Sequence, residues 1–178
     1  MATFTLTCLG DDRPGLVSDL SAAIKSHGGS WERSQMARLA GKFAGILQVE
    51  VPDDEATALV RDLGALAGVG LQVAAERTDV PAVHEAQLLR LELLGADHPG
   101  IVADISAALA ARGIGIEELS TALREAPMAG GLLFEARAVL ELPPGVGAEA
   151  LRSTLEGLAD ELMVDLSLSD ADGGSGAG

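Results

Sequence analysis

The sequence predicts an α+β protein made of two copies of one small domain, each with the order strand, helix, strand, strand, helix, strand. Three observations lead to this prediction. A segment near the start of the chain recurs 85 residues later. Apolar residues alternate where strands are expected and recur every three or four positions where helices are expected. Glycine and proline fall at the boundaries between these segments.

The duplication is clearest where Gly10–Glu32 is set over Gly95–Glu117. Without a gap, 11 of these 23 positions are identical. Further along, Pro52 matches Pro143 at an offset of 91, which places about six additional residues in the second copy, within 125–131. A period near 90 is too long for one unit of a solenoid and suits a small domain that is repeated once.

The repeat divides the chain into four segments. The first domain is expected over 1–76 and the second over 86–169, with a polar linker at 77–85 that contains Pro81. The last segment, 170–178, has no large apolar residue and is expected to be a flexible tail.

The first half of each copy is a strand, a helix and two further strands. Residues 3–9 alternate between apolar and polar side chains, which predicts a half-buried strand. A helix is expected from Pro14 to about His27, because proline suits the first turn of a helix. Asp12 is expected to cap its free N–H groups. Two strands then follow around a tight turn at 40–42.

The second half of each copy adds a helix and a closing strand. The helix opens at Pro52 and is followed by a strand at 71–75; its apolar stripe comprises Ala56, Leu59, Val60, Leu63 and Leu66. Copy two repeats the order with strand 86–94, helix 99–112, hairpin 115–142, helix 147–160 and strand 162–168. This order indicates two tandem ferredoxin-like domains, each an antiparallel sheet with both helices on one face. The crossover rule makes the two strands that flank each helix parallel to each other.

The charge of the chain argues against direct nucleic-acid binding. Twelve Lys and Arg against 27 Asp and Glu give a net charge of −15, whereas proteins that bind nucleic acid neutralise phosphates with a basic surface. RNA-recognition domains with this order of elements stack bases on aromatic side chains. Three Phe, one Trp and no Tyr leave no such platform.

Membrane insertion, metal binding and catalysis are not expected either. No apolar stretch is long enough to span a bilayer and no signal peptide is recognisable, so a cytoplasmic location is expected. Cys8, the only cysteine, is expected to be a small buried hydrophobe. His27, His84 and His98 lack the spacing of metal ligands and are expected at the surface. No catalytic or cofactor motif occurs, so neither enzymatic activity nor a cofactor is expected.

The most informative segment is the loop between the first strand and the first helix of each copy. Residues 10–17 (GDDRPGLV) and 95–102 (GADHPGIV) share the pattern Asp-x-Pro-Gly. Because the pattern occurs twice, each time between an expected strand and an expected helix, it resembles the first strand-to-helix loop of ACT domains. The resemblance covers both copies and nearly the whole chain, and it implies a regulatory module that binds an amino acid.

The chemistry of the two loops suits an amino acid. Free N–H groups at a helix N-terminus attract a carboxylate, glycine lets a ligand approach the backbone, and an aspartate is suited to receive an ammonium group. The candidate ligand-binding residues are Asp12, Arg13, Pro14, Gly15, Leu16 and Val17 in the first loop and Asp97, His98, Pro99, Gly100, Ile101 and Val102 in the second.

The resemblance also implies a second contact just after the first helix. This position is Ser30 in copy one and Gly115 in copy two, so the first loop is expected to be the more competent site. Gly10 and Gly95 stand where serine-sensing relatives carry a histidine, and serine specificity is therefore not implied. In the alternative interpretation the two aspartates only cap the helices, the Pro-Gly pairs shape the turns, and no ligand binds.

Among tandem ACT proteins the chain most resembles the glycine cleavage system transcriptional repressor family. Those proteins have two such domains, no DNA-binding domain, and act by binding a transcription activator. The resemblance implies an amino-acid-responsive regulator that works through protein contacts, with glycine as a possible ligand and a homodimer as a possible assembly. Two alternatives stay open: an accessory subunit of a separately encoded amino-acid-pathway enzyme, and a pure interaction module without a metabolite.

Overall fold

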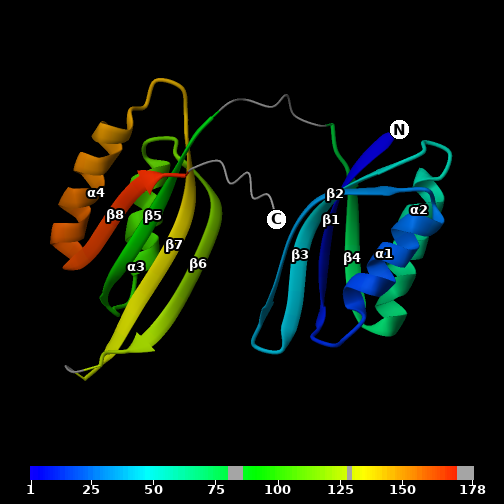
Figure 1. Cartoon of the computed structure of the whole chain (residues 1–178), viewed down its shortest axis with the longest axis horizontal. Coiled ribbons are helices and arrows are strands. Elements are labelled where there is room, and N and C mark those ends of the chain that lie inside the picture. The colour runs from blue at the N-terminus through cyan, green and yellow to red at the C-terminus, as the bar shows by residue number, and fades with distance from the viewer. Residues whose placement is uncertain (80–85, 128–129, 172–178) are drawn as a thin grey trace, which may run out of the picture. The chain divides into compact units, whose positions relative to one another are not determined.

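The computed structural model describes residues 1–79, 86–127 and 130–171. The chain divides into two compact units, Met1–Ala82 and Val83–Gly178, here called domain 1 and domain 2. Each has a four-stranded antiparallel sheet with two α-helices on one face (Figure 1). Within the described ranges, no helix combines the length and the apolar character needed to cross a membrane.

Both domains have the predicted order of elements. Domain 1 consists of β1 (Ala2–Asp11), α1 (Leu16–Ser26), β2 (Ser30–Leu39), β3 (Lys42–Val51), α2 (Ala56–Ala65), the short 3₁₀ helix η1 (Leu66–Val69) and β4 (Leu71–Arg77). Domain 2 consists of β5 (Gln87–Ala96), α3 (Ile101–Ala110), β6 (Gly115–Glu125), β7 (Leu132–Leu142), α4 (Ala148–Leu162) and β8 (Val164–Asp170). The prediction of two tandem ferredoxin-like domains is confirmed.

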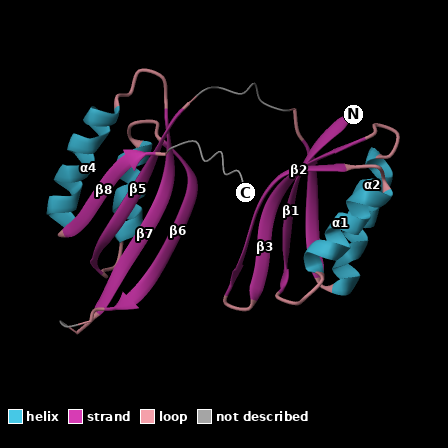
Figure 2. Cartoon of the chain, in the orientation of Figure 1, coloured by secondary structure: helices cyan, strands magenta, loops and turns pink. Residues whose placement is uncertain are grey.

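The sheets have the strand orders β2-β3-β1-β4 and β6-β7-β5-β8, which can be followed in Figure 2. Every neighbouring pair is antiparallel. Because β1 and β2 both run antiparallel to β3, they are parallel to each other, as the crossover rule requires. The first strand of each domain is therefore central, and the strand after the first helix lies at an edge.

Alternation along the central strand and the helical stripes build one core in each domain. In domain 1, Leu6 of β1, Leu20 of α1 and Leu59 of α2 are each 0% exposed. Cys8 lies on the same face of β1 and is buried, as predicted, while Val60, expected in the apolar stripe of α2, is 38% exposed. Domain 2 has a separate core formed in the same way.

The duplication extends to an irregularity in the edge strands. The pairing of β2 with β3 shifts register between Trp31 and Arg33, and the pairing of β6 with β7 shifts between Ile116 and Glu118. In both copies the skipped residue is the identical glutamate of the repeat. Such bulges bend a strand and increase its twist, so both edge strands are shaped by the same device.

The hairpins differ between the domains. In domain 1 a two-residue turn at Ala40 and Gly41 has positive φ at both positions, +50° and +77°, as tight hairpin turns require. In domain 2 the connection is longer, and the N–H of Ala126 donates to the Gly131 carbonyl at 3.0 Å. The additional residues of copy two thus lie in this hairpin.

The domain ends differ slightly from the expected segments. β4 includes Arg77, and the N–H of Thr78 donates to the Thr3 carbonyl at 3.0 Å, so the start of the expected linker belongs to domain 1. β8 likewise includes the first residue of the expected tail. The rest of both segments, 80–85 and 172–178, lies outside the described residues.

Candidate functional site

The first loop is held by its backbone and ends in a glycine with positive φ. The N–H of Asp12 donates to the Gly41 carbonyl at 2.9 Å, which ties the loop to the turn between β2 and β3. Gly15 is the N-cap of α1 with φ +97°, a conformation that favours glycine. The helix therefore begins at Leu16, and the prediction that it begins at Pro14 is wrong.

Asp12 does not cap the helix. No side chain caps α1, and Oδ2 of Asp12 instead accepts a hydrogen bond from Nη1 of Arg38 at 3.2 Å. The neighbouring Asp11 pairs with Lys42. Because Gly15 occupies the N-cap position, Asp12 lies three residues before the position from which a side chain caps a helix. The capping prediction is wrong, and the start of α1 has no side-chain partner.

Arg13 braces the loop from the other side. Its Nη2 donates to the Val69 carbonyl and to Oδ2 of Asp19, both at 2.8 Å, and its Nη1 donates to the Pro14 carbonyl at 3.2 Å. These bonds connect the loop to η1 and to the first turn of α1. All of these partners belong to domain 1, so Arg13 is engaged in shaping the loop.

The second loop has the same backbone but different side-chain contacts. The N–H of Asp97 donates to the Leu132 carbonyl at 3.0 Å, and Gly100 caps α3 with φ +93° and no side-chain bond. His98 replaces Arg13: its Nδ1 lies 3.2 Å from the Pro99 carbonyl, and its buried Nε2 has no partner in the described ranges. Across the same ranges, no cation pairs with the carboxylate of Asp97.

The remaining loop candidates divide into buried and exposed side chains. Leu16 and Ile101 are only 2% and 3% exposed and belong to the cores, so a ligand can meet only their backbone. Val17 and Val102 are 45% and 42% exposed and stand in the first turn of their helices. Each loop thus offers an uncapped helix start, a nearby carboxylate and one accessible valine.

Ser30 is not brought to the first loop. It is the first residue of β2 and pairs with Glu50, whereas Asp12 binds the turn at the far end of the same hairpin. Ten strand residues at about 3.3 Å each separate the two ends by roughly 30 Å. A single ligand can contact both Asp12 and Ser30 only if the serine comes from a second copy of the chain.

Gly10 and Gly95 leave no room for a larger side chain. A Cβ at Gly10 would lie 2.5 Å from the Gly70 carbonyl oxygen, and one at Gly95 would lie 2.4 Å from Cγ1 of Val164. These are the positions at which serine-sensing relatives carry a histidine. The first strand approaches the last strand too closely here for that contact to exist in either domain.

Other candidate chemistry lies away from the loops. Burial raises the pKa of the Cys8 thiol, whose Sγ donates to the Gly45 carbonyl at 3.5 Å. The expectation that His27 lies at the surface is wrong, because its side chain is 10% exposed and sits between two carboxylates; His84 lies outside the described residues. Within the described ranges, no three His, Cys, Asp or Glu side chains group as metal ligands.

The fold and the paired loops define a tandem protein of small regulatory domains. Residues 2–75 match the family model of the ACT domain, and domain 2 repeats both its topology and its loop. Domain 1 is an ACT domain by this match, and domain 2 shares its fold and its Asp-x-Pro-Gly loop.

Solved structures resemble the whole chain. An unknown protein from Galdieria sulphuraria is 30% identical with a TM-score of 0.85, over 96% of this chain and 98% of that chain. A protein described as a "putative glycine cleavage system transcriptional repressor" is 20% identical with a TM-score of 0.70, over 94% of this chain and 96% of that chain. The second likeness shows the fold alone. No curated protein matches the sequence.

Proposed function

We propose that the protein is a non-catalytic regulator that binds an amino acid at its Asp-x-Pro-Gly loops and acts through a protein partner. One observation carries this proposal: in both domains an uncapped helix start lies beside an aspartate that does not serve as its cap. ACT domains typically bind amino acids. Each of these loops has free N–H groups that suit the carboxylate of an amino acid and an aspartate that suits its ammonium group.

The two halves match the two charged groups of the ligand. The free N–H groups at the start of α1 or α3 suit the α-carboxylate, and the positive end of the helix dipole adds to this attraction. The carboxylate of Asp12 or Asp97 suits the α-ammonium group. In the first loop the ligand competes with Arg38 for Asp12, whereas Asp97 has no such competitor among the described residues. The second loop is therefore as good a candidate for ligand binding as the first, although the sequence favoured the first loop.

An indirect role in transcription is part of this proposal. The net charge of −15 disfavours contact with DNA, and the fold is shared with the repressor-like protein named above. Glycine is the first ligand to test, since the absent side chain removes any need for a specificity pocket. We place the protein in the cytoplasm, with a transcription activator as its partner.

There are two alternatives to this proposal. In the first the protein is an accessory subunit of an amino-acid-pathway enzyme. In the second, which is the third possibility overall, it is an interaction module that binds no metabolite. Co-purification from the native host, with and without added amino acids, separates these. An activator in the complex supports the leading proposal, whereas an enzyme supports the first alternative. A complex that is insensitive to every amino acid supports the third.

Asp12→Asn and Asp97→Asn test the loops directly. Each substitution removes a charged hydrogen bond to the ammonium group, which contributes about 1.5–3 kcal/mol, so affinity at that loop falls roughly ten- to a hundredfold. Isothermal titration of the full chain, first with glycine and then with the other standard amino acids, measures it. In the double variant both loops are expected to be weakened by this factor.

Asp54→Asn is the matched control. Asp54 is an exposed aspartate in the turn before α2, remote from the loop along the hairpin, and its loss is expected to leave binding unchanged. If the wild-type chain binds no amino acid at all, the sensing proposal is wrong. If Asp54→Asn weakens binding as much as the loop variants do, the ligand is held by general electrostatics instead.

We further propose that two chains associate through β6. The residues of β6 that pair with buried residues of β7 point to the helix side of the sheet, yet Ile116, Leu119 and Leu123 are 39%, 50% and 53% exposed. Beside them a shallow apolar groove of about 30 Å³ runs along α3. In domain 1 the equivalent space is filled by Met36, whose Cγ would lie 2.5 Å from a Cβ at Gly45.

A second copy of β6 complements the first. Antiparallel pairing centred on Thr121 sets Leu119 opposite Leu123 on the helix side and Glu118 opposite Arg124 on the other side. Cross-strand apolar and opposite-charge pairs each contribute about 0.2–1 kcal/mol, and pairing also satisfies the exposed strand edge. This edge is thus self-complementary, as a twofold contact requires.

Leu119→Arg tests the β6 contact. A charge in the centre of the apolar strip is expected to make the chain monomeric, as measured by light scattering during size-exclusion chromatography at micromolar concentration. Leu39→Arg is the control, because Leu39 is an even more accessible leucine at the end of β2, 81% exposed, and its replacement is expected to leave the dimer intact. A monomeric wild-type chain contradicts the proposal.

A further inference from the structure

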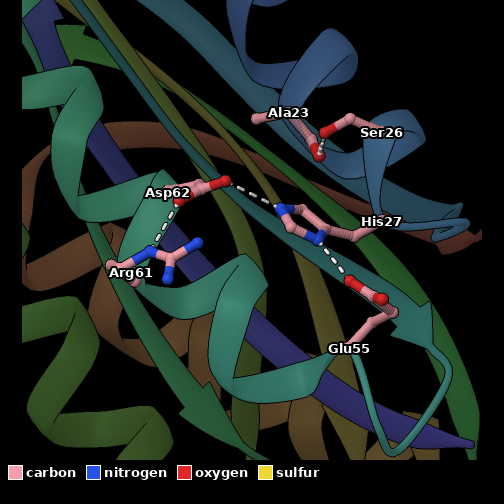
Figure 3. A network of polar contacts seen from close by, with 6 residues as sticks. All are labelled: Ala23, Ser26, His27, Glu55, Arg61 and Asp62. Atoms are coloured by element: carbon pink, nitrogen blue, oxygen red, sulfur yellow. Dashed lines mark hydrogen bonds and ion pairs between the residues drawn. The ribbon is translucent and has the colours of Figure 1, made fainter.

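His27 occupies an enclosed position between the two helices of domain 1. It is the C-cap of α1, and its side chain is 10% exposed. Figure 3 shows the imidazole pointing between two acidic side chains of the α2 region. Nδ1 lies 2.7 Å from Oε2 of Glu55, and Nε2 lies 3.0 Å from Oδ2 of Asp62. Both ring nitrogens therefore face a carboxylate at hydrogen-bond distance.

The number of protons decides how many of these contacts are hydrogen bonds. A neutral imidazole carries one N–H, so it can donate to only one carboxylate, and its other nitrogen presents a lone pair to the second. The imidazolium carries two N–H groups and donates to both. The cation is also favoured by the C-terminal end of α1, where the helix dipole is negative.

The charged groups around the ring also affect the balance between imidazole and imidazolium. Glu55 faces the ring from the N-cap of α2 and Asp62 from within that helix, and Arg61 of α2 donates from Nε to the other oxygen of Asp62 at 2.9 Å. On α1 itself the basic residue of the last turn is Lys25, which is exposed. The hydrogen bonds with Glu55 and then Asp62 raise the pKa of His27 above its ordinary value.

The described part of domain 2 has no equivalent cluster. Arg112 stands in place of His27, Gly147 in place of Glu55 as the N-cap of the second helix, and Thr154 in place of Asp62. Nη1 of Arg112 donates to the Ala108 carbonyl of its own helix at 3.2 Å. Arginine keeps its charge at every pH that the protein meets, so this end of α3 does not respond to protons.

We propose that His27, Glu55 and Asp62 form a proton-dependent clamp that fastens the end of α1 to α2 in domain 1 alone. With the imidazolium present, two charge-assisted hydrogen bonds join the helices. When the proton leaves, one of them is lost and a lone pair faces a carboxylate. Because α1 runs from the first loop to His27, the clamp controls how firmly that helix is held at the end remote from the loop.

The sign of the pH dependence follows from the raised pKa. The clamp contributes its full stability below the unfolded-state pKa of histidine, about 6.5, and loses it as the pH rises through the higher pKa of the folded state. Domain 1 is thus expected to become less stable as the pH rises through the neutral range, while domain 2 lacks this contribution.

An NMR titration of the histidines in the full chain tests the clamp. His27→Gln identifies the His27 signal among the three, and the same titration in concentrated urea supplies the unfolded reference. We expect His27 to titrate at a higher pH in the folded chain than in urea. A folded pKa equal to or below the unfolded one overturns the proposal without any variant having to fold.

Neutral replacements of the two carboxylates supply the second measurement. Glu55→Gln and Asp62→Asn are each expected to lower the pKa of His27 towards its value in urea, because each removes the negative charge of one hydrogen-bond acceptor. Asp54→Asn, next to Glu55 but not facing the ring, is the matched control and is expected to leave the titration unchanged. If the control moves the pKa as far as the other two, the cause is the overall negative charge and the clamp is disproved.

Trp31 supplies a readout of domain 1 stability. It is the only tryptophan of the chain and packs against the core of domain 1. We expect the thermal midpoint seen by its fluorescence to fall as the pH rises through the neutral range in the wild-type chain, and to fall less in His27→Gln. Equal pH dependence in the two chains contradicts the clamp.

Discussion

Leu20→Ala is expected to lower the free energy of unfolding of domain 1 by about 2–5 kcal/mol, the usual cost of removing a buried leucine and leaving a cavity. Leu20 is 0% exposed in the centre of α1 and belongs to the core beneath both helices. Urea unfolding followed by the fluorescence of Trp31 measures this loss, because that residue reports on domain 1 only.

Leu155→Ala is the matched variant in domain 2. Leu155 of α4 is also 0% exposed, but it belongs to the other core. Its loss is expected to shift the unfolding seen by circular dichroism while leaving the Trp31 transition in place. If both variants shift the Trp31 transition equally, the two domains unfold as one cooperative unit and the separate cores are not energetically independent.

Gly10→Ala is expected to destabilise domain 1 by about 1–3 kcal/mol, the range for forcing extra atoms into a packed site. The new Cβ would meet the backbone carbonyl of Gly70 at 2.5 Å. A carbonyl in the chain entering β4 cannot rotate away as the end of a flexible side chain would, so β1 and β4 must separate locally. The Trp31 fluorescence transition again measures the change.

Gly64→Ala provides the opposite expectation in the same domain. Gly64 lies in α2, and nothing is within 4 Å of the position its Cβ would take. Alanine restricts the unfolded chain and favours helix, so we expect a gain of about 0.5–1 kcal/mol. Equal losses in the two variants would show that the cost at Gly10 does not come from the close approach of the two strands.

The secondary structure was predictable because its signals are local. Alternation in 3–9, the spacing of apolar residues in the helices and the tight turn at residues 40–42 each involve neighbours in sequence. Because the domain is duplicated, each of these sequence patterns occurs twice, which strengthens the prediction. Boundaries were less accurate: Gly15, in the left-handed conformation, is the N-cap, so α1 starts two residues later than Pro14 suggested.

The candidate site was predictable only in part. The Asp-x-Pro-Gly loops lie where the pattern placed them, but the partner of Asp12 is Arg38, 26 residues away on an edge strand. Ser30 follows α1 closely in sequence. It starts β2, however, so the whole length of this strand separates it from the turn that Asp12 contacts. The two positions that the family pattern assigns to one ligand, Asp12 and Ser30, therefore do not lie close together within one domain.

By itself, the sequence determined that the chain is a duplicated βαββαβ protein with one Asp-x-Pro-Gly loop per copy, because periodicity, turn residues and repeats are properties of neighbours along the chain. Only the tertiary structure decided which side chains meet. His27 had no local signal, since Glu55 and Asp62 lie 28 and 35 residues further on. Packing of α1 against α2 encloses the ring between those carboxylates. A contact between residues so far apart in sequence can be identified only from the packing of the helices.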